Sequence, residues 1–131
     1  MRPSQSSLTL AAALVLAACV STKALRMDES LTLAPICPAG VRLFTDSTKV
    51  GQPYQVVALL TSSGDDDRGA MTRSQKKKAA KLGANGVILG TMRTGSSGVV
   101  IGAYVGMEAR GEAVAIYIPA DSVRVRTACH A

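Results

Sequence analysis

Apolar runs separated by turn residues predict a series of strands along this chain. The first three candidates cover residues 41–45, 54–60 and 86–92. The run at 54–60 is apolar at adjacent positions, so both of its faces are expected to be buried, as in a central strand. Two further candidates cover 98–105 and 113–118, and in the latter small Ala alternates with large Val and Ile. We expect its small side to lie under a helix and its large side to face a thicker layer.

One main helix is predicted at residues 72–83. Thr72 and Gln75 have the T-x-x-Q spacing of a capping box, and Gly83 supplies a left-handed stop at the other end. The side chains expected to be buried are few and mostly small, and they are Met71, Gln75, Ala79 and Leu82. A helix with so small a stripe is expected to lie close against a sheet.

The end of the chain completes the predicted fold. Residues 108–112 form a polar turn between two strand candidates, and residues 122–126 alternate Val with Arg as a terminal edge strand does. One main helix among strands that short turns connect indicates an α+β fold with a single, mostly antiparallel sheet of about four to five strands.

An apolar segment near the amino terminus predicts export. Arg2 precedes an apolar run at 8–18, which is too short to span about 30 Å of hydrocarbon. The run ends in Leu-Ala-Ala-Cys at 16–19, which resembles the lipobox of bacterial lipoproteins. The resemblance implies cleavage before Cys19, a lipid on its thiol and, because Val20 rather than Asp follows, sorting to the outer membrane. An ordinary secretory signal cut near Ala18 is the alternative.

This cleavage site sets the predicted domain organisation. Residues 1–18 form the lipoprotein signal peptide, and residues 19–39 form the lipidated N-terminus and a flexible tether, because they are polar, contain prolines and lack periodicity. Residues 40–131 form a small α+β domain on the periplasmic face of the outer membrane.

Composition narrows the classes of function. A chain of 131 residues with 47% hydrophobic and 18% charged residues suits one globular domain rather than a disordered tail. Aromatic residues make up 3%, which argues against a base-stacking surface, and the predicted compartment also excludes nucleic acid. The formal net charge of +6 leaves an anionic partner open.

Three segments carry a resemblance to a known family. They are VRLFT at 41–45, VGQPY at 50–54 and KAAKLGANGVIL at 78–89. They resemble the bacterial family of the outer-membrane stress sensor of the Rcs phosphorelay (RcsF) and of the YbjQ-like domains, over about residues 40–118. The resemblance implies an α+β fold and a role in envelope sensing. The sensor's domain has two disulfides, whereas this domain has two cysteines, and no ligand set here matches the heavy-metal binding ascribed to YbjQ-like proteins.

The two cysteines of the predicted domain allow more than one state. Cys37 and Cys129 would lie outside the cytoplasm, where disulfides persist, so a bridge between them is predicted. Two free thiols are the alternative. A metal site of Cys37, Cys129 and His130 is a weaker hypothesis, because no further soft ligand lies nearby in sequence.

The predicted helix carries a cluster of positive charges. It consists of Arg73, Lys76, Lys77, Lys78 and Lys81. No acidic residue lies among them, so the cluster is either a contact face for lipid phosphate, lipopolysaccharide or an acidic protein, or a solvated helix face.

Two further motifs are interpreted as structural features rather than binding sites. The triplet Asp65–Asp67 lacks the spaced ligands of a calcium loop and reads as a solvated loop. Gly98, Gly102 and Gly106 resemble G-x-x-x-G but are interpreted as strand glycines.

The sequence contains no recognisable set of catalytic residues. The sole histidine is at position 130, and the paired carboxylates Glu108 and Glu112 fall in the predicted turn. We therefore expect a non-enzymatic, cofactor-free module that acts by protein contact in envelope maintenance or stress sensing, held to the membrane by its lipid and bound to an envelope protein. A small ligand- or metal-binding protein is the alternative, and an enzyme is the third hypothesis.

Overall fold

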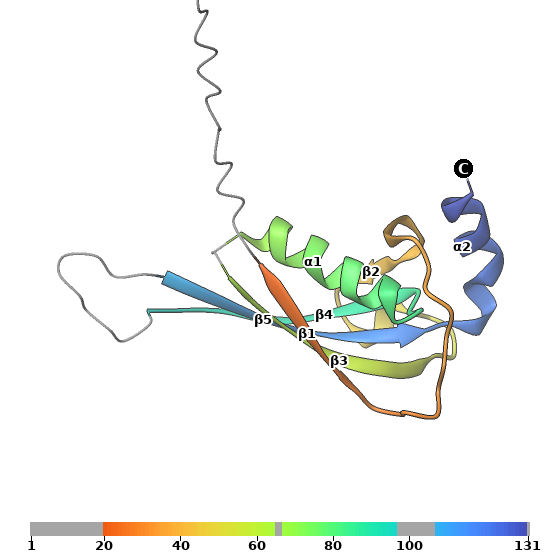
Figure 1. The fold of residues 1–131 in the computed structure, drawn as a ribbon, viewed down its shortest axis with the longest axis horizontal. Helices are drawn as coiled ribbons and strands as arrows, with labels where there is room; N and C mark the ends of the chain where they lie inside the picture. The colour runs from red at the N-terminus through yellow and green to blue at the C-terminus, as the bar shows by residue number, and fades with distance from the viewer. Residues whose placement is uncertain (1–19, 65–66, 97–106, 131) are drawn as a thin grey trace, which may run out of the picture.

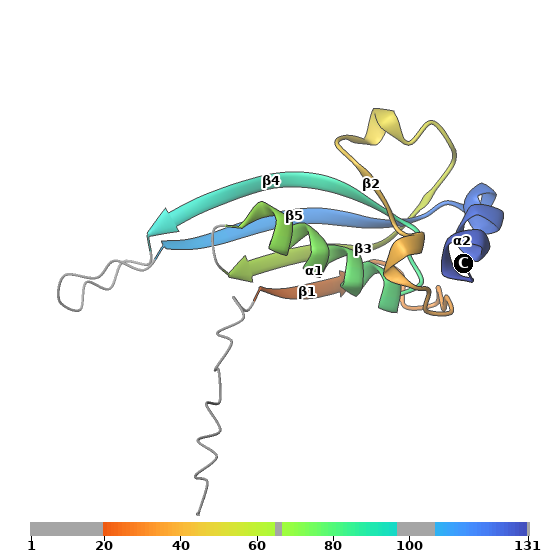
Figure 2. The same ribbon diagram turned by 90° about the horizontal axis from the view of Figure 1, so that it is seen from above.

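The predicted α+β class is confirmed by a computed structural model that describes residues 20–64, 67–96 and 107–130. Five strands form one sheet in the order β1-β3-β5-β4-β2, with α1 lying across one face (Figures 1 and 2). The strands are β1 (Ser21–Arg26), β2 (Arg42–Phe44), β3 (Gln55–Gly64), β4 (Gly86–Ser96) and β5 (Met107–Tyr117). The helices are α1 (Arg68–Lys81) and α2 (Ser122–Cys129), with 3-10 turns η1 (Pro38–Gly40), η2 (Ser47–Lys49) and η3 (Pro119–Asp121).

The sheet is mostly antiparallel, as expected. β5 lies between β3 and β4 and is antiparallel to both, and β1 is antiparallel to β3. Only the β2–β4 pair is parallel among the pairs that the structure describes. β3 and β4 therefore run in the same direction, and α1 connects them by crossing over β5.

Small side chains let α1 lie close to the sheet. Ala79 and Ala80 of α1 are buried in one cluster with Ala113 and Ala115 of β5. Closer to the start of the helix, Gly111 has no Cβ where Met71 packs. The predicted alternation in β5 is confirmed, because Ile116 belongs instead to a second cluster with Phe44, Val50 and Ile118.

The predicted stop at Gly83 is also confirmed. Gly83 has φ +78, and a Cβ there would overlap the Cβ of Leu33 and lie 2.7 Å from the Ala34 carbonyl oxygen. The left-handed conformation and the close approach of the 33–34 segment both require glycine.

Gly83→Ala is expected to lower the free energy of unfolding by more than about 2 kcal/mol, because the left-handed conformation alone costs about 1–2 kcal/mol for an L residue. Gly51→Ala is the matched control, since Gly51 has φ +66 with nothing within 4 Å of an added Cβ. Urea unfolding measures both. Equal losses for the two variants would show that the contact with Leu33 adds nothing.

The predicted tether is wrong for residues 21–26, which form β1 and pair with β3 from Ser21↔Ser63 to Arg26↔Ala58. The segment after β1 also packs on the domain, because Leu31, Leu33 and Ile36 lie against the main core cluster. The sheet gains an edge strand because backbone pairing does not require an apolar pattern on the paired strand.

The predicted strand at 122–126 is wrong, because these residues begin α2. Helical spacing lets the Asp121 carboxylate accept a hydrogen bond from the side chain of Arg124, which lies three residues further along the chain. It also buries Val125 while Val123 stays 64% exposed, which an alternating strand with both valines on one face would not do.

Two boundaries also differ from prediction. α1 begins at Arg68, and the Asp67 side chain caps it by accepting a hydrogen bond from the Ala70 N–H. The predicted cap at Thr72 is therefore wrong. Gln75, the other residue of the predicted capping box, is buried in the helix face. The predicted turn at 108–112 is part of β5. The strand predicted at 98–105 lies outside the described residues.

Candidate functional site

A continuous row of apolar residues crosses all five strands on the sheet face opposite α1. Strand register places Leu25 beside Leu59, Leu59 beside Val114, Val114 beside Ile88 and Ile88 beside Phe44. Val114 lies between Ala113 and Ala115, which face α1, so its side chain and the row belong to the other face.

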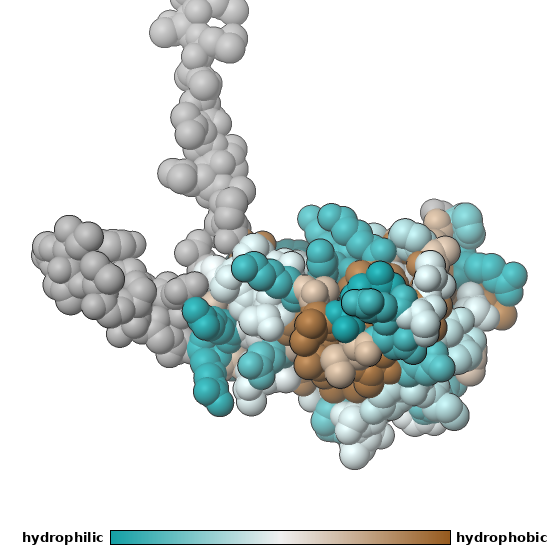
Figure 3. Space-filling view, turned by 60° about the horizontal axis from the view of Figure 1, so that its bottom comes forward, coloured by the Kyte–Doolittle hydropathy of each residue, from teal (hydrophilic) through white to brown (hydrophobic). Residues whose placement is uncertain are grey.

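The two ends of this row differ in exposure. At the β2 end Phe44 is buried against Val50 and Ile118. At the β1 end Leu25 is 65% exposed and Leu59 is 40% exposed, and Val56, which pairs with Ile116 on the same face, is 38% exposed. We call these three residues the apolar patch, and brown atoms gather on this face in Figure 3. Contiguous exposed apolar residues mark interaction surfaces more often than isolated ones do.

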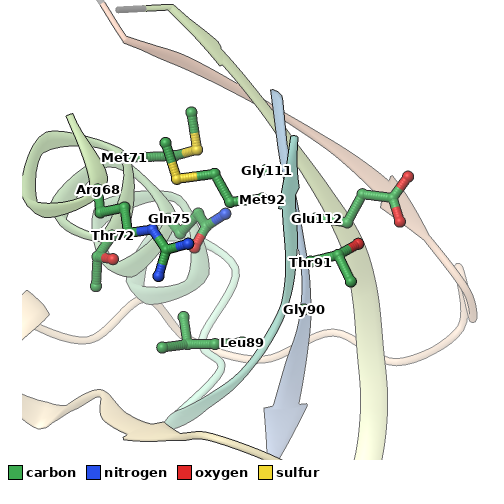
Figure 4. A pocket seen from close by; sticks show the side chains of 10 residues that line it. All are labelled: Arg68, Met71, Thr72, Gln75, Leu89, Gly90, Thr91, Met92, Gly111 and Glu112. Carbon is green, nitrogen blue, oxygen red and sulfur yellow. The ribbon is translucent and has the colours of Figure 1, made fainter. Parts of the chain in front are cut away.

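Charged residues border the apolar patch on the side toward Ser21, at the start of β1. Lys23 and Glu112 both flank Thr61, and the next row places Arg110 beside Arg93. Figure 4 shows Glu112 on the side of the sheet away from α1. At the other end of β1, Ser30 donates its hydroxyl and its N–H to the Asp28 carboxylate, and these hydrogen bonds lower the pKa of Asp28. The patch is therefore an apolar surface with a charged rim.

The predicted cationic cluster lies on α1, on the opposite side of the molecule. Arg73, Lys77 and Lys81 are exposed and follow one another at intervals of four residues, so they form one line along the outer surface of the helix. Lys76 and Lys78 flank this line and are half-buried. Within residues 20–64, 67–96 and 107–130, the ion pairs present are Arg42–Asp121 and Arg124–Asp121.

The predicted disulfide between Cys37 and Cys129 is confirmed. It joins the segment before β2 to the end of α2 with 5.5 Å between the Cα atoms. Gly40 lies against this bridge, since a Cβ at Gly40 would be 3.1 Å from the Cys129 Sγ. The bond consumes both thiols, so the weaker hypothesis of a metal site from Cys37, Cys129 and His130 is wrong. No group of three His, Cys, Asp or Glu residues with metal-site geometry occurs in the described part of the chain.

Two small cavities lie beside the helices. One, of about 120 Å³, lies between α1 and β4, where Met71, Gln75 and Met92 point toward each other (Figure 4). The other, of about 260 Å³, is lined by residues that include Leu33, Tyr117, Val125 and Arg126. Both are smaller than the roughly 300–1,000 Å³ of ordinary ligand pockets.

Two buried polar residues that sequence reasoning did not single out hold the ends of the elements together. Asn85 donates to the Ile118 carbonyl over 2.8 Å and accepts from the Ile118 N–H over 2.7 Å. The largely buried Asp121 carboxylate accepts from Arg124 at 2.8 Å and lies 3.6 Å from Arg42. Both sites are structural, because every partner is a group of the fold itself.

Several predicted site residues lie outside the described residues. They are Cys19, Asp65, Asp66, Gly98, Gly102 and Gly106. The third residue of the acidic triplet, Asp67, caps α1. Among the residues described, no helix is both long and apolar enough to cross a membrane.

Comparisons with known proteins leave the family unassigned. No family model matches the chain, and no curated protein matches it. The chain is similar to the crystal structure of a Francisella virulence factor, FvfA, in its orthorhombic form. The two share 16% identity with a TM-score of 0.47, over 72% of this chain and 97% of that chain.

Proposed function

We propose that this protein is a lipid-anchored module on the periplasmic face of the bacterial outer membrane. It acts without catalysis, by binding another envelope protein in envelope maintenance or stress sensing. Residues 16–19 and the segments that resemble the RcsF and YbjQ-like family support the location and the process.

The observation that supports protein contact is the apolar patch. Leu25, Val56 and Leu59 come from two neighbouring strands, and α1 covers the other face of these strands. A partner that covered them would remove apolar surface from water, which favours association by about 25 cal/mol per Å² before the costs of binding. The alternative, a small ligand-binding protein, has the 260 Å³ cavity as its best location.

A photo-crosslinking amino acid at Leu59 is expected to capture one discrete envelope protein in intact cells. The same group at Lys77, which is exposed on the other side of the molecule, is expected not to capture it. Leu25→Lys should reduce the adduct at Leu59 severalfold by placing a charge in the patch. The thermal midpoint should change little, because substitutions at exposed sites usually alter stability by less than about 0.5 kcal/mol.

The pattern of adducts decides between the hypotheses. An adduct that forms equally from Leu59 and Lys77, or that survives Leu25→Lys, would argue against the patch as the contact surface. Retention of a small molecule by the purified protein, lost when Val125 in the 260 Å³ cavity is enlarged to Phe, would favour the alternative.

A further inference from the structure

The first described residues are fastened to α1 by a chain of hydroxyl groups. Ser74 Oγ donates to the Val20 carbonyl over 3.4 Å, and it lies 2.7 Å from Thr22 Oγ1. Thr22 Oγ1 lies 2.7 Å from Ser62 Oγ of β3 in turn. Ser62 is fully buried, so this chain of hydrogen bonds starts in the interior. The path of the backbone at Val20 is therefore set by the flank of α1.

This arrangement places Val20, which follows the proposed lipid attachment site in the sequence, beside the cationic line of α1. Cys19 is bonded to Val20, and consecutive Cα atoms are about 3.8 Å apart. Ser74, which holds Val20, immediately follows Arg73 and lies one helical turn before Lys77. A lipid on Cys19 would therefore be attached one residue from the point where the chain is held beside these two cations.

The cationic line has the length and charge to contact several lipid phosphates. With a rise of 1.5 Å per residue, Arg73 and Lys81 are about 12 Å apart along the helix. The α1 sequence from Arg68 to Lys81 contains no acidic residue. The basic residues on the other face have Glu112 among them, so α1 carries the more uniform positive surface.

We propose that Arg73, Lys77 and Lys81 rest on the anionic phosphate layer of the membrane that holds the lipid of Cys19, so that α1 lies against the membrane surface. The inference rests on the proposed acylation of Cys19. It follows that the apolar patch, on the opposite face of the sheet, is directed away from the membrane and toward a partner. Lipid phosphate is the favoured ligand over an acidic protein, because the covalent lipid keeps phosphates next to the helix at all times.

Fluorophores on single cysteines test this orientation in the mature, acylated protein. With Cys19 acylated and Cys37 bonded to Cys129, none of the three native cysteines is free, so Lys77→Cys and Thr61→Cys each provide one labelling site. The protein is placed in phosphatidylcholine vesicles, with or without phosphatidylglycerol, that carry a quencher in the headgroup layer. Intact mass establishes acylation independently of the fluorescence.

The expected result is quenching about twofold or more stronger at position 77 than at position 61 in the phosphatidylglycerol vesicles. Each basic residue near an anionic surface strengthens binding about fivefold, so the difference should disappear in Arg73→Glu with Lys81→Glu. It should also disappear in vesicles of phosphatidylcholine alone, whose headgroups carry no net charge, and near 1 M salt, where the Debye length is about 3 Å. Lys23→Glu with Arg110→Glu changes the net charge by the same amount on the other face and should leave the difference intact.

Each contrary result has its own meaning. Equal quenching at 77 and 61 in a protein with the acylated mass overturns the orientation and leaves the proposed anchoring standing. A mature mass without lipid overturns the anchoring and this inference with it. Loss of an envelope-protein adduct in the Arg73/Lys81 variant, with unchanged quenching, would assign the cationic line to an acidic protein instead. The salt and phosphatidylcholine measurements need no charge variant, so they decide the question even if that variant does not fold.

Discussion

Replacing both Cys37 and Cys129 by alanine is expected to lower the free energy of unfolding by up to about 4.5 kcal/mol. The bridge closes a loop with a sequence separation of 92, and in the chain-entropy model a loop of that length restricts the unfolded chain by this amount. Urea unfolding of the variant beside the oxidised parent measures the loss. Reduction of the parent by dithiothreitol under the same conditions should give a similar value.

The same substitution tests how α2 is held. α2 contacts η1, which directly follows Cys37, so loss of the bridge should expose amide protons of α2 to hydrogen exchange before those of β5. A loss below about 1 kcal/mol, which is ordinary for a point substitution, would show that packing alone holds the C-terminal helix.

Asn85→Ala is expected to destabilise the protein by about 3 kcal/mol. The substitution leaves the Ile118 N–H and carbonyl without their side-chain partners, and each buried polar group that loses its partner costs about 1–3 kcal/mol. Gln52→Ala removes an amide from an exposed position and is the matched control, with an expected change near zero. Denaturant midpoints for both variants provide the measurement.

Asn85→Asp separates the contribution of the Asn85 hydrogen bonds to stability from that of its side-chain volume, because the two side chains are similar in size. A carboxylate keeps the acceptor for the Ile118 N–H but faces the Ile118 carbonyl without a proton, so the variant should gain stability as the pH falls and the carboxyl protonates. A variant as stable as the parent at neutral pH would show that the amide donor at Asn85 contributes little.

Local signals were sufficient for the centre of the fold. Alternation of small and large residues in β5 predicted which face lies under α1, and Gly83 marked the end of that helix, because both features depend on residues close in sequence. The burial of Gln75 and Ala79 followed from helical spacing for the same reason.

The elements that were missed depend on distant partners. β1 is an edge strand with little apolar pattern, and its buried contacts run from Thr22 to hydroxyls on β3 and α1. In α2, an alternation over five residues was too short to distinguish a strand from a helix. The ion pairs of Asp121 with Arg42 and Arg124 favour the helix, and Arg42 is distant in sequence.

The two candidate surfaces also differ in whether they depend on residues that are close in sequence. The cationic line on α1 was visible as a cluster in the sequence, because its residues lie within one helix. The apolar patch was not visible, because Leu25 and Leu59 are 34 positions apart and strand register alone brings them together.

The Cys37–Cys129 bridge also determines how the protein responds to mechanical tension. A pull between Val20 and the C-terminus passes through the covalent bond, so the residues within the loop bear no load. Only residues 20–37 and the last residues can then be drawn out, to a contour length of about 60 Å, against roughly 380 Å for residues 20–131 without the bridge. Tension applied at the N-terminal end of β1 would therefore peel β1 from β3 while the other four strands and both helices keep their arrangement.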